Sequence, residues 1–340
     1  MQQGVLLPAL AAVLGAAFTV ALLVQWRGRR RDFQLVWAIG VAAFALGAAV
    51  EALAAAGDWS PPLARIWYVS GAVATAGWLG LGTAFLLART RFGYSFAFAL
   101  ALGGIVTIAT GRRFEDAGAL HLAYGLTAIA LALVVATETY FAGSRWPRVG
   151  LVAIGGATVL AIALAATAPA ATGSLVDGAT GLPDASGFPT PLRLLVPFTN
   201  VVGAVTLVLG ATFSAYEFMP KRRVLPYSLD PTQTGDQFLF NLLIAPVALA
   251  VNLVASLPGA LRALLAGELN RRVPATILIA FGGLVPALAD TAMSRLGEPA
   301  FHAAGLVAGI GLLFLGFVLA TGTGRPEPGP AHRPADPTAA

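Results

Sequence analysis

Long apolar runs are the feature of this sequence that most restricts its fold. Several of them reach the roughly 20 residues that an α-helix needs to cross the hydrocarbon core of a bilayer. Two such runs lie between Phe33 and Ala88 and are joined only by the short turn Gly57–Pro62. Hydrophobic residues make up 57% of the chain and charged residues 11%, against about 25% charged residues in soluble domains. We therefore expect an all-α fold, a polytopic transmembrane helix bundle.

The apolar runs divide the chain into one transmembrane helical domain, residues 1–321, and a tail. The domain is expected to hold a core of seven spans over residues 5–216, an added element over 217–272, and two last spans over 273–321. The expected spans cover about 5–25, 33–55, 64–88, 94–111, 118–141, 149–170, 192–216, 273–291 and 299–321. The tail, 322–340, is rich in proline and charge, a composition that predicts disorder.

The segment at about 237–268 leaves two topologies open, because it is apolar but interrupted by polar residues and prolines. If it does not cross, nine spans place sixteen of the 21 Lys and Arg residues on one side and five on the other. If it crosses, ten spans split them twelve to nine. Basic residues concentrate in cytoplasmic loops. The sequence therefore favours nine spans with a re-entrant or interfacial element, and ten spans remain the alternative.

The same rule predicts the orientation and the location of the protein. The N-terminus is expected outside and the C-terminus inside a bacterial cytoplasmic (inner) membrane. The bilayer is the expected partner, together with a small polar ligand or a lipid headgroup. No nucleic-acid partner is expected, because the basic residues lie in loops between spans. The oligomeric state is left open.

Composition also excludes several kinds of chemistry. The chain has no cysteine, so it has neither disulfides nor thiolate ligands for a metal. Its one lysine, Lys221, lies in a basic loop, so no lysine is placed inside the bundle for a retinal Schiff base. No nucleotide-binding, hydrolase or metalloprotease motif is present. We expect no cofactor, no metal and no catalytic residue, and the sequence leans away from an enzyme.

Ionisable residues at the outer ends of the expected spans are the candidates for a binding site. Glu51 lies about one turn inside the end of the second span, and Arg65 opens the third. A charged group at the centre of a bilayer costs about 2.5–3.5 kcal/mol on insertion scales, and such residues are often functional. The residues expected to line an outward-facing polar site, roofed by the loop at 172–191, are Glu51, Arg65, Tyr68, His121, Asp290 and His302. In the alternative, Glu51 and Arg65 form a structural ion pair across the hairpin and the histidines meet headgroups.

Other residues are assigned to packing. Glycines at close spacing, such as Gly77 and Gly80, let lipid-embedded helices approach each other. Trp26, Trp67 and Trp146 lie at expected span ends, where aromatic belts form.

Three functions remain compatible with the sequence. The leading interpretation is a non-enzymatic binding or sensing module, which predicts an outer pocket that is closed towards the inside. A small-solute or proton-coupled transporter predicts a polar path that touches both faces and includes Glu138. A membrane-embedded lipid-modifying enzyme predicts a metal, or an acid–histidine pair within hydrogen-bond reach.

Parts of the sequence resemble a group of uncharacterised bacterial multi-span membrane proteins. The resemblance is carried by Trp37–Gly40, Phe44, Gly47, Glu51, Arg65, Trp67–Tyr68, Gly71, Trp78–Gly80, Gly82–Thr83, Asn200–Tyr216 and Ile277–Gly297. It implies a bundle of seven or more helices in which 224–268 is an addition, and it implies no activity. More distantly, the seven-span part resembles the membrane sensor regions of bacterial histidine kinases, although this sequence carries no kinase domain.

Overall fold

A computed structural model describes residues 2–168, 175–178, 180–228, 235–296 and 298–321. Within these ranges the secondary structure is helical apart from a single bridge between Val176 and Pro183. The elements are α1 (Gln2–Arg29), α2 (Asp32–Ala56), α3 (Pro61–Trp67), the π-helix η1 (Tyr68–Ala74), α4 (Thr75–Leu86), α5 (Gly93–Gly111), α6 (Leu120–Tyr140), α7 (Pro147–Thr167), the 3₁₀-helix η2 (Ala185–Gly187), α8 (Thr190–Arg193), α9 (Leu195–Phe218), α10 (Gly235–Leu265), α11 (Arg272–Leu296) and α12 (Ala300–Thr321). The tail at 322–340 lies outside the described residues.

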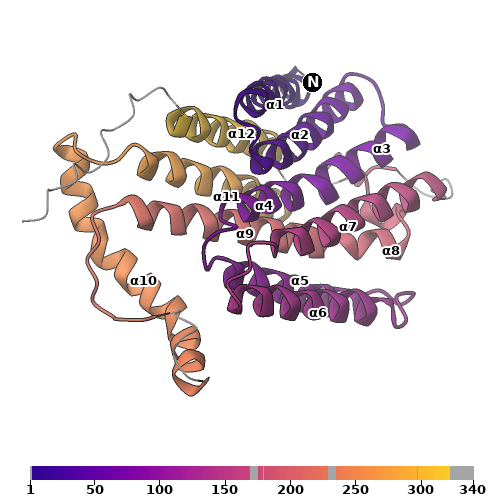
Figure 1. Cartoon of the computed structure of the whole chain (residues 1–340). Helices are drawn as coiled ribbons and strands as arrows, with labels where there is room; N and C mark the ends of the chain where they lie inside the picture. Colours follow the sequence, from indigo (N-terminus) through magenta and orange to yellow (C-terminus); the bar gives the residue numbers. More distant parts are fainter. Residues whose placement is uncertain (1, 169–174, 179, 229–234, 297, 322–340) are drawn as a thin grey trace, which may run out of the picture.

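The all-α transmembrane bundle expected from the sequence is confirmed. Ten helices of the described chain are long and apolar enough to cross a membrane, counting α3–η1–α4 as one and α8–α9 as one. Consecutive helices pair in hairpins, α1 with α2, α5 with α6, and α11 with α12. Long helices run back and forth side by side across the view in Figure 1.

Helices α4 and α9 form the centre of the bundle, because each packs against several others. Helix α4 contacts α2, α7 and α9, while α9 also contacts α5 and α11. Glycines bring the two backbones together: a Cβ added at Gly80 would lie 2.4 Å from the carbonyl oxygen of Gly203. A Cβ added at Gly203 would lie 2.1 Å from the carbonyl oxygen of Ala76. Only glycine permits this approach at both positions.

Helix α10 differs from the other long helices in direction. Figure 1 shows it lying steeply across the end of the bundle where α9 ends and α11 begins. Its side chains bind the segment that leaves α9: Asn252 Oδ1 accepts hydrogen bonds from the backbone N–H groups of Val224 and Leu225, at 2.7 and 2.9 Å. Ser256 Oγ accepts one from the N–H of Arg222 at 2.8 Å. Helix α10 is therefore held at the level of the α9 terminus, the arrangement expected for an interfacial element in a nine-span bundle.

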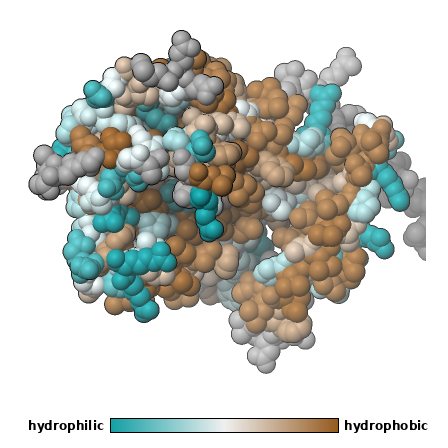
Figure 2. All heavy atoms as spheres, turned by 180° about the vertical axis from the view of Figure 1, so that it is seen from behind, coloured by the Kyte–Doolittle hydropathy of each residue, from teal (hydrophilic) through white to brown (hydrophobic). Residues whose placement is uncertain are grey.

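The free side of α10 is apolar along its length. Large hydrophobic residues recur on it at helical spacing and are exposed, among them Leu243, Val247, Val254 and Leu261. Figure 2 shows a band of hydrophobic residues over the middle of the bundle, with hydrophilic residues gathered towards the edges of that face. An apolar band between two polar ends is the surface expected of a protein that contacts a lipid bilayer.

Candidate functional site

A cavity of about 430 Å³ lies between α2, the α3–η1–α4 span, α9, α11 and α12. Most of its wall consists of small or apolar side chains, with Thr75 and Asn200 as polar exceptions along its length. Glu51, Asp290 and His302 line the end beside the turn between α2 and α3, which the sequence predicts to lie outside the membrane and which is called the outer end below. The volume lies within the range of small-molecule sites, which is about 300–1,000 Å³.

The π-helix η1 shapes one wall of this cavity. Its wider turn is marked by Thr75, whose N–H and side-chain hydroxyl both donate to the carbonyl oxygen of Ser70, five residues earlier. Gly47 of α2 packs against this turn, since a Cβ added there would lie 3.2 Å from the Cα of Gly71. A Cβ added at Gly71 would meet no atom within 4 Å, so this glycine borders open space. Single π turns inside α-helices are frequent at functional sites.

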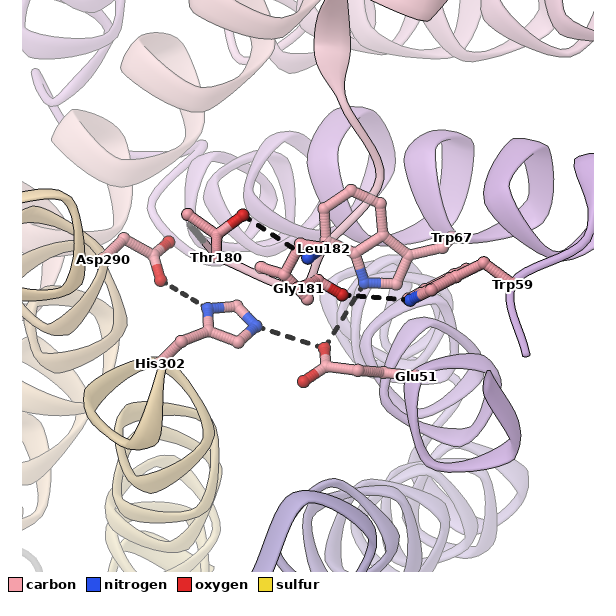
Figure 3. Close-up of polar contacts among 8 residues, drawn as sticks. All are labelled: Glu51, Trp59, Trp67, Thr180, Gly181, Leu182, Asp290 and His302. Carbon is pink, nitrogen blue, oxygen red and sulfur yellow. Dashed lines mark hydrogen bonds and ion pairs between the residues drawn. The ribbon is translucent and has the colours of Figure 1, made fainter. Parts of the chain in front are cut away.

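Four side chains from four helical segments form a continuous polar chain at the outer end of the cavity (Figure 3). The first contact joins Asp290 Oδ1 of α11 to His302 Nδ1 of α12 at 2.6 Å. The second joins His302 Nε2 to Glu51 Oε2 of α2 at 3.1 Å. The indole N–H of Trp67 then donates to the same Glu51 oxygen at 3.4 Å. The chain runs from the Asp290 side chain, which is 53% exposed, to the Glu51 side chain, which is 9% exposed.

The two nitrogen–oxygen contacts determine the charge of this group. Each contact needs one proton between its atoms, because two lone pairs do not attract each other. Two protons on the imidazole give one cation and two carboxylates. One proton on the imidazole and one on a carboxyl group give a neutral ring, a neutral acid and one carboxylate. Both arrangements leave Asp290, His302 and Glu51 with a net charge of −1.

A second cavity, of about 350 Å³, lies on the outer side of the same residues. Glu51, His302, Leu182 and Met293 line both cavities, so these four side chains form the wall between them. The loop before α8 covers this outer cavity through residues 180–182. It is attached to the hairpin after α2 by a hydrogen bond of 3.1 Å from the indole N–H of Trp59 to the carbonyl oxygen of Gly181. Of the loop at 172–191 that the sequence predicted to cover the site, residues 180–182 line this cavity.

The opposite end of the inner cavity is lined by residues of a packed core. Leu79, Leu207 and Leu313 line the cavity and also belong to a buried cluster that includes Trp37 and Phe317. His302 and Leu313 are eleven residues apart on α12, a rise of about 16 Å. The cavity therefore extends roughly half the thickness of a hydrocarbon core of about 30 Å.

Three of the residues expected at the site lie elsewhere. Arg65 donates to the carbonyl oxygen of Ala168 at 2.5 Å, on another side of its span from Trp67. Tyr68 is buried and stacks on Phe188, with ring centroids 4.1 Å apart. His121 lies between α5 and α6, where Gly111 leaves room for it, and its Nδ1 has no hydrogen-bond partner among the described residues.

The alternative prediction of an ion pair between Glu51 and Arg65 is wrong. Among the described residues the ion pairs are His302 with Glu51, His302 with Asp290, and Lys221 with Glu217, so Glu51 does not pair with Arg65. Glu51 and Arg65 are close along the chain, but they point to different neighbours.

Sequence reasoning missed the tryptophans of the site. Trp67 was assigned to an interfacial belt, yet its N–H is directed at Glu51, and Trp59 holds the covering loop. The two indoles pack edge to face, with ring centroids 6.0 Å apart. A signal was present in the sequence, since Trp59 lies in the hairpin turn that follows Glu51 and Trp67 lies five residues after that turn.

The part of the chain that the structure describes contains no group of three or more His, Asp or Glu side chains arranged to hold a metal ion. The two ring nitrogens of His302 face different carboxylates, so its ligand atoms do not converge on one point.

No family model matches the chain, and no curated protein or solved structure matches it. The resemblance to multi-span bacterial proteins stays an expectation from the sequence.

Proposed function

We propose that this chain is a multi-pass protein of a bacterial cytoplasmic membrane that binds a small amphiphilic ligand from the outer side. It acts as a non-enzymatic binding or sensing module, with its N-terminus outside and its C-terminus inside. One observation carries the proposal: a polar chain that ends on buried Glu51 stands at the mouth of an apolar cavity of about 430 Å³.

The two parts of the cavity suit the two parts of an amphiphile. An apolar tail would fill the space beside Gly71 and Leu207, where most of the cavity wall is apolar. A polar head would meet Glu51 and His302 near the outer end. Burial of apolar surface, at about 25 cal/mol per Å², supplies affinity, and the few polar groups supply orientation.

A transporter is the second candidate, favoured by the two cavities that meet at Glu51 and His302. It would also need a route to the inner side. Leu79, Leu207 and Leu313 close that direction, and Glu138 lies on α6, which does not line the cavity. A cysteine at Ala287 tests this in a chain without native cysteine. Labelling of Ala287→Cys by an impermeant maleimide only from the outer side supports binding, and labelling also from the inner side favours transport.

A lipid-modifying enzyme is the third candidate, because His302 lies within hydrogen-bond reach of two carboxylates. Both ring nitrogens are occupied by these contacts, so neither is available to a substrate. Neither cavity is lined by a described serine, and cysteine is absent from the chain. The arrangement therefore favours binding over catalysis.

Filling the cavity tests the proposed function. Gly71→Leu places a side chain in open space inside the cavity, whereas Gly156→Leu places the same side chain on the exposed surface of α7. The full chain is extracted in native lipid particles, and its bound small molecules are measured by mass spectrometry. A saturable amphiphile retained by wild type and Gly156→Leu but lost from Gly71→Leu is the expected result. Equal retention by Gly71→Leu would overturn the proposal.

A further inference from the structure

Resting on the proposed function, we infer that the ligand is a cationic amphiphile, with a single ammonium headgroup held at Glu51 between Trp59 and Trp67. Three features of the site point to this ligand class: its charge, an unused acceptor atom and the aromatic residues at the cavity mouth.

The group formed by Asp290, His302 and Glu51 carries one more negative charge than it can offset itself. Asp290, His302 and Glu51 together carry −1, by the proton count above, and the Glu51 side chain is 9% exposed. A buried charge is costly unless an opposite charge accompanies it. No Lys or Arg among the described residues lines either cavity. His302 can offset only one of the two carboxylates, so one negative charge remains on the group formed by the buried Glu51 and the exposed Asp290, and a monovalent cation would neutralise it.

One acceptor atom of Glu51 is unused. Both of its contacts, to His302 and to Trp67, involve Oε2. Figure 3 shows the other carboxylate oxygen turned away from these donors, and no described residue donates to it. Because Glu51 lines both cavities, this oxygen is accessible to a ligand that enters from the outer cavity. An ammonium group with N–H bonds can donate a hydrogen bond to this oxygen, and a quaternary ammonium can contact it through its positively polarised methyl groups.

Two tryptophans line the cavities that Glu51 also lines. Trp67 lines the inner cavity and Trp59 the outer one, and each has its indole N–H already bound. Their remaining contribution is the ring face, which attracts cations within about 6 Å of the centroid. A carboxylate together with indole rings suits an ammonium headgroup, whereas a phosphate, sulfate or carboxylate headgroup would meet a site that is already negative.

Amphiphiles that share a tail and differ in headgroup charge test the inference. Dodecyltrimethylammonium, dodecanoate and neutral dodecanol are added at low mole fraction to the full chain in maltoside micelles at pH 7. Affinity is measured from the shift in thermal unfolding. Wild type is expected to bind the cation at least about 30-fold more tightly than Glu51→Gln does, the effect of removing one partner of a buried charge pair. Glu217→Gln, which removes a carboxylate at the other end of the bundle, is the charge control and should bind as wild type does.

The outcomes separate this inference from the proposed function. If dodecanol or dodecanoate binds as tightly as the cation, and Gly71→Leu abolishes all three, the cavity site stands and the cationic class is overturned. A preference for a neutral carbonyl-bearing amphiphile such as a quinone overturns it in the same way. If Gly71→Leu and wild type respond alike to every probe, the proposed function itself fails. Cation selectivity that Glu51→Gln removes and Gly71→Leu blocks supports both.

Discussion

Replacing His302 by phenylalanine should destabilise the protein far more than the small change in side-chain volume suggests. The change keeps an aromatic ring but leaves the Glu51 carboxylate, with its side chain 9% exposed, in contact with the Trp67 N–H alone. Breaking one partner of a buried ion pair costs about 3–5 kcal/mol. Asp290 loses the same partner, but its side chain is 53% exposed, so we expect Asp290→Asn to cost at most about 1 kcal/mol.

A double-mutant cycle isolates this effect. In His302→Phe/Glu51→Leu both partners are apolar, and such replacements are often close to neutral. The double variant should therefore recover at least about 2 kcal/mol of the loss, which is a large coupling energy. The free energy of unfolding is measured by titrating maltoside micelles with dodecyl sulfate and following helicity by circular dichroism.

The matched control is the exposed pair of Lys221 and Glu217, 2.8 Å apart, in which the Glu217 side chain is 52% exposed. Its cycle, Glu217→Gln with Lys221→Met, should give a coupling below about 1 kcal/mol. Additive effects of the His302 and Glu51 changes, or couplings of equal size in both cycles, would refute the reasoning.

Three further results are expected. Gly203→Ala forces a Cβ to within 2.1 Å of a backbone oxygen and should cost about 3 kcal/mol of unfolding free energy. The control Gly156→Ala, with open space around it, should be neutral or stabilising by up to about 1 kcal/mol. Equal losses in the two variants would contradict the close contact between α4 and α9. Single cysteines at Lys221 and Glu268 should be labelled from the same side of the membrane, and labelling from opposite sides would show that α10 crosses. Hydrogen bonds from the side chain and backbone of Ser186 lower the pKa of Asp184. The Asp184 carboxylate therefore stabilises the loop at neutral pH, and this contribution is lost as the pH falls through the lowered pKa, below about 4. Amide exchange in the loop, corrected for intrinsic rates, should rise on acidification in wild type but not in Asp184→Asn.

The spans could be predicted from the sequence because the bilayer restricts the backbone so strongly. In hydrocarbon each N–H and C=O must be paired within its own helix, so the length of an apolar run nearly determines the length of a helix. The 237–268 segment is the instructive case. Its composition is apolar enough for a tenth span, and only the distribution of Lys and Arg residues favoured a re-entrant or interfacial element.

The site was predictable only in part. Counting spans placed Glu51, Asp290 and His302 at one end of the bundle, and the structure brings these three together. Counting spans does not show how each helix is rotated about its axis, so it could not predict which side chains face the cavity. Arg65 and Trp67 are two residues apart, which turns their side chains by about 200°, so one faces the cavity when the other faces away.

The π turn at Tyr68–Ala74 has a consequence for how this span tolerates changes in length. It holds one more residue than an α-helical turn, so the loss of a single residue there could be absorbed by a return to α-helix without breaking the hydrogen-bond ladder. The two ends of the span would then be rotated relative to each other by about 100°. Trp67 would leave Glu51 while the packing of α4 on α9 stayed in place. One residue of chain length thus sets the angle between the part of the span that builds the cavity mouth and the part that holds the bundle together.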